Sequence, residues 1–105
     1  MSLLYIVMII YYLSKSDKKN KKYYVLLFNF KNRRWGKKIY FGDNRYEDYT
    51  THKDIERKYR YIKRHNKREN WNNPLTAGFW SRWILWNKPT IYESMRDIEN
   101  KFNKF

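Results

Sequence analysis

The chain begins with an apolar segment, after which cationic and apolar stretches alternate. Residues 1–13 (MSLLYIVMIIYYL) are almost wholly apolar, but residues 3–13 as a helix would span only ~16 Å, about half of a bilayer core. A strand or helix buried against the domain or a neighbour is favoured, with a membrane anchor as the alternative. A cleaved signal peptide fits less well, because no basic leader precedes the segment and no small-residue cleavage site follows it.

A lysine-rich stretch follows the apolar segment. Residues 14–22 contain five lysines, which would suit the anionic face of a membrane if the apolar segment enters one. We predict that residues 1–22 form an apolar tail and a lysine-rich linker, and that residues 23–105 form a single small domain. The linker cations are Lys15, Lys18, Lys19, Lys21 and Lys22.

Two apolar stretches separated by a turn predict an antiparallel β-hairpin. Residues 23–30 (YYVLLFNF) are rich in the aromatic and β-branched residues that favour strands. Residues 38–42 (KIYFG) have the pattern of the returning strand. The connection between them is KNRRWGKK, in which Gly36 is the conformationally permissive residue.

Residues 52–68 have the pattern of a basic amphipathic helix. Thr51 is the predicted N-cap, with Asp54 three residues later as in a capping box. An apolar stripe at helical spacing is formed by Ile55, Tyr59 and Ile62, and cations fall on the opposite face. The interleaved tyrosines and cations suit contacts with phosphates and bases, or docking to an acidic protein. The predicted basic interaction face consists of Lys53, Arg57, Arg60, Arg64, Lys67 and Arg68.

Residues 71–89 (WNNPLTAGFWSRWILWNKP) contain four of the five tryptophans. Asn73 followed by Pro74 predicts a helix start, and residues 75–86 are apolar on nearly all sides, with Arg82 as the one charge. Such a helix is buried, because it is too short to span a membrane. A stacking platform or a docking patch would instead need exposed rings. The predicted aromatic core is Trp71, Phe79, Trp80, Trp83 and Trp86.

The C-terminal residues predict one more helix. Thr90 and Glu93 form a second capping box, and Met95, Ile98 and Phe102 share one face, with Phe105 on it if the helix continues to the end. The predicted fold class is therefore α+β: a short antiparallel β-hairpin followed by three helices, with an apolar N-terminal tail.

The charge balance narrows the class of partner. The chain has 24 Lys and Arg against 10 Asp and Glu, a net charge of +14, so a polyanion or an acidic surface is expected to offset its self-repulsion. The absence of cysteine excludes disulfides, thiolate zinc sites and thiol catalysis.

Few residues are arranged for catalysis. His52, Asp54 and Glu56 invite a metal-site interpretation, but capping and surface ion pairs explain them better. His65 is surrounded by cations, and glycine-rich phosphate loops and hydrolase motifs are missing from the sequence. We predict a protein without catalytic residues, cofactor, metal or small-molecule substrate.

Several unusual segments recur in a known order. DYT-HKD is followed by RY-RH-KRE-W-NP-TAG and then by SRW-LWNKP, and with these segments residues 41–102 resemble a family of small basic proteins of large nucleocytoplasmic DNA viruses of algae and protists. The resemblance implies a viral source. That family has no assigned biochemical activity, so it offers no catalytic residues to transfer.

The favoured function is that of a non-enzymatic virion structural protein, a minor capsid protein that cements the shell through basic and aromatic contacts. Its partners would be the major and other minor capsid proteins, and residues 1–13 could enter the inner membrane. It would reside in the virion, in or just beneath the capsid, after assembly in the host cytoplasm. The alternative is a nucleic-acid-binding protein without sequence specificity that organises or packages the viral genome.

Overall fold

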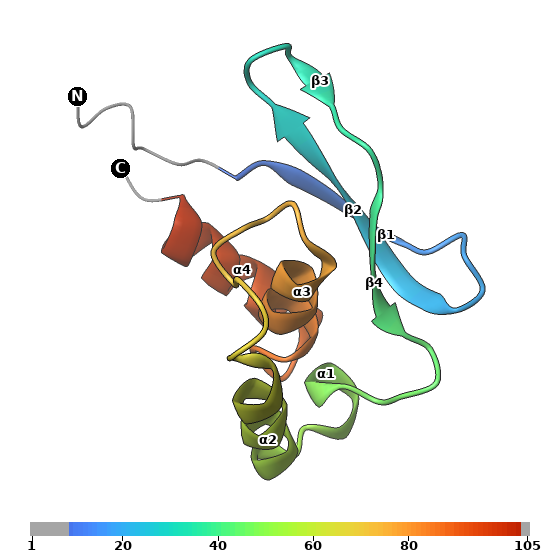
Figure 1. The fold of residues 1–105 in the computed structure, drawn as a ribbon, viewed down its shortest axis with the longest axis vertical. Coiled ribbons are helices and arrows are strands. Elements are labelled where there is room, and N and C mark those ends of the chain that lie inside the picture. The colour runs from blue at the N-terminus through green and yellow to red at the C-terminus, as the bar shows by residue number, and fades with distance from the viewer. Residues whose placement is uncertain (1–8, 104–105) are drawn as a thin grey trace.

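The computed structural model describes residues 9–103, which adopt an α+β fold, as predicted (Figure 1). A four-stranded antiparallel sheet comes first and helices follow it. The strands are β1 (Tyr11–Lys15), β2 (Lys21–Asn29), β3 (Arg34–Trp35) and β4 (Ile39–Asp43). The helices are α1 (Tyr49–His52), α2 (Ile55–His65), α3 (Ala77–Trp80), the π-helical segment η2 (Ser81–Leu85) and α4 (Ile91–Phe102).

The predicted hairpin forms the centre of the sheet. β2 lies between β1 and β4, with Val25 opposite Leu13 on one side and opposite Ile39 on the other. β3 extends the returning arm and pairs with the end of β2. Within the turn, the Gly36 amide donates to the carbonyl of Leu27 at 2.8 Å. The β2–β3 end of this hairpin projects beyond the helices (Figure 1).

The end of the apolar segment is part of the sheet. β1 pairs with β2, and Ile9 just before it is buried. The Asn103 side chain holds Ile9 in place: the Ile9 amide donates to Asn103 Oδ1 at 2.6 Å, and Asn103 Nδ2 donates to the Ile9 carbonyl at 3.1 Å. The predictions for residues 1–8 and for Phe105 lie outside the described residues. Among residues 9–103, none of the helices combines the length and apolarity that crossing a bilayer requires.

The start of the basic helix differs from the prediction. Thr51 is not the N-cap of the basic helix, because it lies inside the short helix α1. Asp48 caps α1 by accepting from the Thr50 amide at 3.0 Å. The chain then breaks at Lys53, which has a left-handed backbone with φ of 57°. Asp54 caps α2 by accepting from the Glu56 amide at 3.0 Å. The helix predicted over residues 52–68 therefore begins at Ile55, and it ends at His65.

The predicted apolar stripe of α2 does not face the core. Ile55 and Tyr59 are 43% and 61% exposed, whereas Tyr61 is buried. The Tyr61 ring lies parallel to that of Trp86 at 4.4 Å and also stacks on His65 at 4.3 Å. The stacking of the Tyr61 ring on Trp86 and His65 therefore decides which side of α2 packs inward.

The tryptophan-rich helix begins later than predicted. Asn73 closes a turn, accepting from the Leu75 amide at 3.0 Å, and Thr76 is the N-cap of α3, accepting from the Phe79 amide at 3.2 Å. The helix then widens into η2, in which the Trp86 amide reaches back to the Ser81 carbonyl at 3.0 Å.

The last helix forms as predicted. Thr90 accepts from the Glu93 amide at 3.1 Å, as in a capping box, and the Glu93 carboxylate accepts at 2.9 Å from the Thr90 hydroxyl in place of the Thr90 amide. Ile98 is fully buried, and Met95 and Phe102 pack against the core from the same face.

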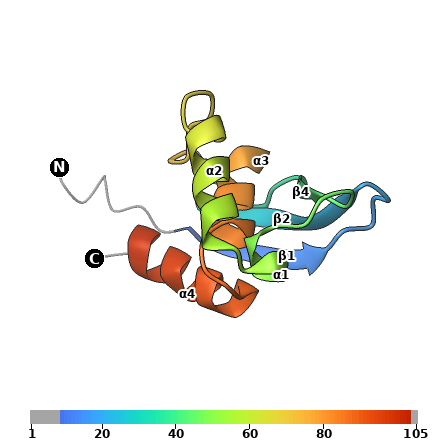
Figure 2. The same cartoon turned by 90° about the horizontal axis from the view of Figure 1, so that it is seen from below.

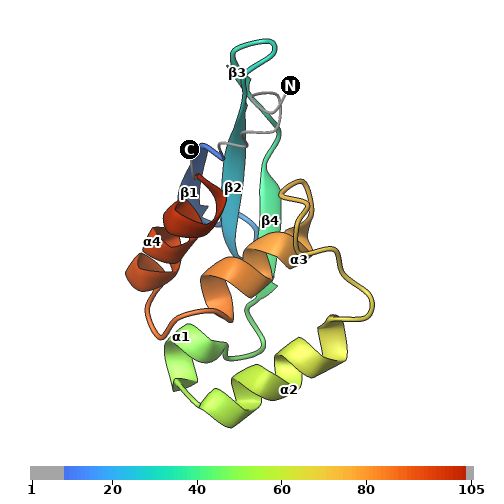
Figure 3. The same ribbon diagram turned by 90° about the vertical axis from the view of Figure 1, so that its left-hand side faces the viewer.

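α3, η2 and α4 lie on one side of the sheet, and the core fills the space between these two layers, whereas α1 and α2 lie beyond one end of the strands (Figures 2 and 3). Val25 and Phe41 come from the sheet and meet residues of α3, η2 and α4. Burying these side chains contributes ~1.5–3 kcal/mol each. The helical side of the core consists of Phe79, Trp80, Ile84, Leu85 and Ile98, all at most 1% exposed.

Candidate functional site

The sheet presents a second face that the helices leave uncovered. Along a strand, side chains alternate between the two faces, and directly paired residues share a face. Tyr12 opposes Leu26, Tyr24 opposes Tyr40, and Phe28 opposes Trp35. We call these six residues the bare sheet face: Tyr12, Tyr24, Leu26, Phe28, Trp35 and Tyr40.

The bare sheet face is dense in aromatic rings that extend onto the projecting hairpin. The ring of Phe28 lies 5.4 Å from that of Trp35 and 5.1 Å from that of Phe30. Trp35 is 49% exposed and Phe30 is 53% exposed. None of these aromatic residues was predicted from the sequence to be a site residue. The sequence did contain a signal for them, namely the aromatic residues at alternate positions of residues 23–30 and the RRWGKK turn that follows.

Lysines lie directly over two of these rings. Lys18 Nζ is 4.2 Å from the ring centre of Tyr40, and Lys38 Nζ is 4.6 Å from that of Tyr24. Asp17 joins this group, accepting from the Tyr40 hydroxyl at 2.6 Å and from Lys38 Nζ at 2.9 Å. The Tyr40 hydroxyl, followed by the Lys38 ammonium, lowers the pKa of the Asp17 carboxyl to about 2.

The linker cations lie in and beside the β1–β2 connection, where they divide into two groups. Lys15, Lys18 and Lys19 are exposed, whereas Lys21 and Lys22 are half-buried. Lys22 forms an ion pair with the buried Asp48 carboxylate at 2.6 Å.

The predicted basic interaction face is also divided: Arg57, Arg60 and Arg64 lie on α2, whereas Lys53 precedes this helix and Lys67 and Arg68 follow its last residue. Lys53 donates to the carbonyls of Thr50 and Pro89, and Arg57 pairs with Glu47 at 3.5 Å. Arg64 lines a cavity next to α2. The remaining three are exposed and have no ion-pair partner in the part of the chain that the structure describes: Arg60, Lys67 and Arg68.

The residues of the predicted aromatic core differ in depth. Phe79 and Trp80 are fully buried, Trp83 and Trp86 are partly buried against the core, and Trp71 is half-buried. The indole nitrogens of Trp80 and Trp83 donate to the carbonyls of Pro74 and Trp71, both at 2.8 Å. Arg82 lies with its guanidinium carbon 4.4 Å from the Trp83 ring centre and donates to the Trp86 carbonyl at 2.8 Å.

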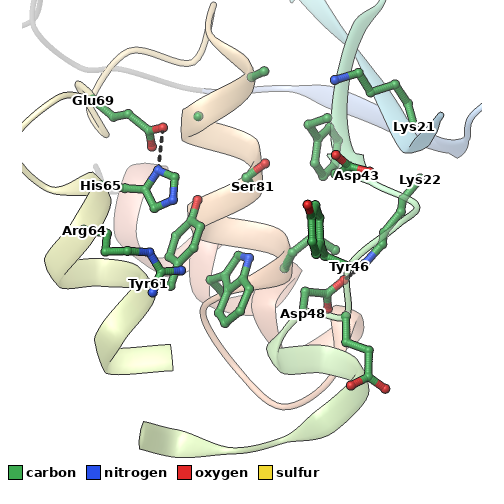
Figure 4. A pocket seen from close by; sticks show the side chains of 17 residues that line it. Lys21, Lys22, Asp43, Tyr46, Asp48, Tyr61, Arg64, His65, Glu69 and Ser81 are labelled. Carbon is green, nitrogen blue, oxygen red and sulfur yellow. Dashed lines mark hydrogen bonds and ion pairs between the residues drawn. The ribbon is translucent and has the colours of Figure 1, made fainter. Parts of the chain in front are cut away.

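A cavity of about 440 Å³ lies between α2, the start of α3 and the end of β4. Figure 4 shows His65, Tyr61 and Ser81 around it. Glu69 holds His65, with its Oε2 3.0 Å from His65 Nδ1, and its Oε1 accepts from the indole of Trp71 at 2.9 Å. Gly78 permits this approach, because a Cβ there would lie 2.9 Å from Glu69 Oε1.

The chemistry of the cavity follows from that arrangement. A carboxylate only accepts hydrogen bonds, so Glu69 fixes the proton of neutral His65 on Nδ1 and leaves Nε2 as an acceptor. Burial raises the pKa of Tyr61 and keeps its hydroxyl a donor. The charges at the cavity are of both signs, since Lys21, Lys22 and Arg64 face Asp43, Glu47 and Asp48 (Figure 4). The cavity therefore has no single-signed field that would select an ion.

The second histidine belongs to the break between α1 and α2. His52 Nδ1 accepts from the Asp54 amide at 2.9 Å, and Asp54 itself caps α2. Burial of His52, followed by repulsion from Arg57, lowers its pKa. Within residues 9–103, no three His, Cys, Asp or Glu side chains are grouped closely enough to hold a metal ion.

Comparison with known proteins identifies a family. Residues 11–65, more than half of the chain, match the model of a family described as "Family of unknown function (DUF5754)". The matched residues extend from the first residue of β1 to the last residue of α2 and so include the whole sheet. No curated protein and no solved structure matches the chain.

Proposed function

The chain belongs to the family of unknown function DUF5754, and we propose that it is a non-enzymatic structural component of a virus particle. In this proposal it is a minor capsid protein that cements the shell by docking onto acidic surfaces. The observation that carries the proposal is a set of exposed cations on α2 and just beyond its C-terminal end that have no ion-pair partner among the described residues. These are Arg60, Lys67 and Arg68, which we call the α2 set.

The charge balance supports a docking role. Of the 24 Lys and Arg side chains, five pair with a carboxylate among the described residues. Cations that remain unpaired repel one another, and an acidic partner would relieve this repulsion while steering the encounter. The buried tryptophan-rich helix gives these cations a rigid support.

The proposed setting comes from the resemblance of residues 41–102 to proteins of large DNA viruses. The partners would be the major and other minor capsid proteins. The protein would reside in the virion, in or just beneath the capsid, after assembly in the host cytoplasm. Residues 1–13 remain a proposed contact with a neighbour or with the inner membrane.

Incorporation into particles tests this proposal. In the virus that encodes the chain, Arg60, Lys67 and Arg68 are replaced together by Gln. The matched control removes three cations from the projecting hairpin: Lys31, Arg33 and Lys37. Quantitative mass spectrometry of purified particles then gives the ratio of this protein to the major capsid protein. We expect the α2 variant to be depleted and the hairpin variant to be retained with the shell on stepwise disruption. Full incorporation of the α2 variant would contradict the proposal.

The bare sheet face favours a second candidate function, a nucleic-acid-binding protein without sequence specificity that organises or packages the viral genome. Exposed rings beside cations, as at Trp35 and the hairpin, are the composition that phosphate backbones and bases require. Titration with DNA at two salt concentrations tests it, because neutralised phosphates make affinity fall steeply with salt. Binding that is absent at low salt, or unaffected by salt, would exclude this candidate.

A further inference from the structure

We infer that the bare sheet face is a binding site for single-stranded nucleic acid, with bases stacked on its aromatic rings and phosphates held by the cations around it. This inference rests on the nucleic-acid candidate above and adds to it the site, the strand state and the mode of contact. It moves the site away from α2, where the sequence pattern had placed it.

The orientation of α2 gives the first reason. The sequence paired Tyr59 with Tyr61 as rings for stacking, but Tyr61 is 6% exposed and covered by Trp86 and His65. Of the two, Tyr59 is the ring that solvent can reach, at 61% exposure. The sheet and its projecting hairpin instead offer several exposed rings, at Tyr12, Phe30 and Trp35.

The spacing of the rings gives the second reason. Tyr24 and Phe28 lie on the same face of β2, with Leu26 between them. Alternate side chains of a strand lie ~6.8 Å apart, so Tyr24 and Phe28, four residues apart, lie ~13.6 Å apart, which is about four of the ~3.4 Å steps of bases along a duplex strand. The row is therefore long enough to meet several successive bases of one strand. Tyr12, Tyr40 and Trp35 widen the row onto the adjacent strands.

The charge around the rings gives the third reason. Lys18 and Lys38 lie over the rings of Tyr40 and Tyr24, so bases would stack on these two rings once the lysines turn from them to the phosphates. The projecting hairpin adds further exposed cations at the Trp35 end of the row (Figure 1). These are Lys31, Arg33, Arg34 and Lys37. An apolar protein partner would leave all of these charges without a counter-charge.

The strand state follows from the chemistry of stacking. In a duplex the faces of the bases are already stacked on one another, so flat rings on a sheet reach them only in an unpaired strand. Every base has an aromatic face, and stacking is therefore tolerant of sequence. The bare sheet face should prefer single strands and show weak base preference.

Asp17 provides a test in which the affinity should change in the opposite direction: removing a ring should weaken binding, whereas removing the Asp17 charge should tighten it. Its carboxylate lies at the bare sheet face, where it pairs with Lys38 and the Tyr40 hydroxyl. An approaching phosphate would meet this negative charge and compete for Lys38. Asp17→Asn should therefore tighten binding.

The test measures the affinity of the full chain for three labelled probes by fluorescence anisotropy: a 20-mer oligothymidine, a 20-mer oligouridine and a 20-base-pair duplex. The variants are Tyr24→Ala and Trp35→Ala, and Trp35→Phe keeps a ring at the second position. Tyr92→Ala is the matched control, since Tyr92 on α4 is 68% exposed and lies on the helical side of the molecule, outside the bare sheet face. Thermal unfolding of each variant shows that it is folded at the temperature of the measurement.

We expect single strands to bind more tightly than the duplex, with oligothymidine and oligouridine alike. Each ring removal should weaken single-strand binding about fivefold or more, whereas Trp35→Phe and Tyr92→Ala should leave it nearly unchanged. The hairpin triple variant (Lys31, Arg33 and Lys37 to Gln) should reduce the slope of affinity against salt by about one for each phosphate that no longer meets a cation. The α2 triple variant (Arg60, Lys67 and Arg68 to Gln) removes the same amount of charge and should leave the slope of affinity against salt unchanged.

The outcomes separate this inference from the candidate function. Steep salt dependence with equal duplex binding and no effect of the ring variants would overturn the inference and leave a phosphate-binding protein. Absence of binding at low salt would overturn both. A last outcome is that the parent protein is a dimer, and that Tyr24→Ala or Trp35→Ala makes it monomeric without changing its affinity for the probes. The bare sheet face would then be a self-association surface, and the inference would be wrong.

Discussion

The two faces of the sheet carry similar residues in opposite environments. On β4, Phe41 points to the helices and is 1% exposed, and its ring stacks on Tyr23 at 5.9 Å. Its neighbour Tyr40 points the other way, where Lys18 lies over its ring and its hydroxyl bonds to Asp17. Consecutive aromatic residues therefore serve the core and the surface in turn.

The same contrast holds on the edge strand. Tyr11 packs against Trp80, with ring centres 4.7 Å apart, while Tyr12 is 53% exposed on the bare sheet face. Rings on the covered face meet other apolar groups, and rings on the bare face meet cations and water. Stability should therefore depend on the covered face and binding on the bare face.

The largest expected difference between the faces is in the free energy of unfolding. Phe41→Ala removes a fully buried ring and leaves a cavity, so it should cost about 3–5 kcal/mol. Tyr40→Ala on the same strand should shift the unfolding midpoint far less, since its ring is not part of the core. Urea unfolding followed by tryptophan fluorescence measures both. Equal losses would show that the bare sheet face is itself a second core surface.

A smaller difference should appear at alkaline pH. Burial, followed by the charge of Glu99, raises the pKa of Tyr11 from 10.0 to about 12. The unfolded chain therefore loses this proton first, and the Tyr11 contribution is complete below pH 10 and disappears as pH rises towards 12. A shift of this size, reduced because the Tyr11 ring is partly exposed, corresponds to a loss of about 2 kcal/mol in the free energy of unfolding.

Tyr11→Phe isolates that contribution. The variant should lose less stability than the parent protein between pH 10 and about 12, as measured by urea unfolding at each pH. Part of the alkaline loss should persist, because burial also raises the pKa of Tyr61. A parallel decline in both proteins would mean that Tyr11 titrates alike in the folded and unfolded chains.

The covered face was largely predictable from the sequence. Apolar spacing in α4 and its capping residues located the start of that helix to the residue, because Thr90 and Glu93 satisfy each other locally. The strands 23–30 and 38–42 were placed within two residues of β2 and β4. Local hydrogen bonding and periodicity decide these features.

The orientation of α2 and the existence of a bare sheet face were not predictable. Tyr61 turns inward because Trp86, which is distant in sequence, provides a flat partner. The pattern of residues 23–30 fits a buried strand or a half-buried one equally well, since Tyr24 and Phe28 on the bare face are as apolar as Tyr23 and Val25 on the covered one. Whether a second layer covers a face depends on the tertiary arrangement, which periodicity within one strand does not encode.

The smallest expected effect concerns polar contacts on the bare sheet face. The Tyr40 hydroxyl is the main reason that the pKa of the Asp17 carboxyl is lowered from 3.8 to about 2. Tyr40→Phe should raise this pKa towards 3.8, and carbon-detected NMR titration of the carboxyl measures it. Lys38→Gln should raise it as well, by removing the second contact.

Linkage fixes the sign of the accompanying change in stability. Because the pKa of Asp17 is lower in the folded chain, its contribution is present above pH 3.8 and is lost as pH falls towards 2. Tyr40→Phe should therefore flatten the acid limb of the stability profile only slightly, since these groups are exposed and screened by solvent. An effect of Tyr40→Phe as large as that of Phe41→Ala would place a structural role on the bare sheet face and remove the distinction between a face for folding and a face for binding.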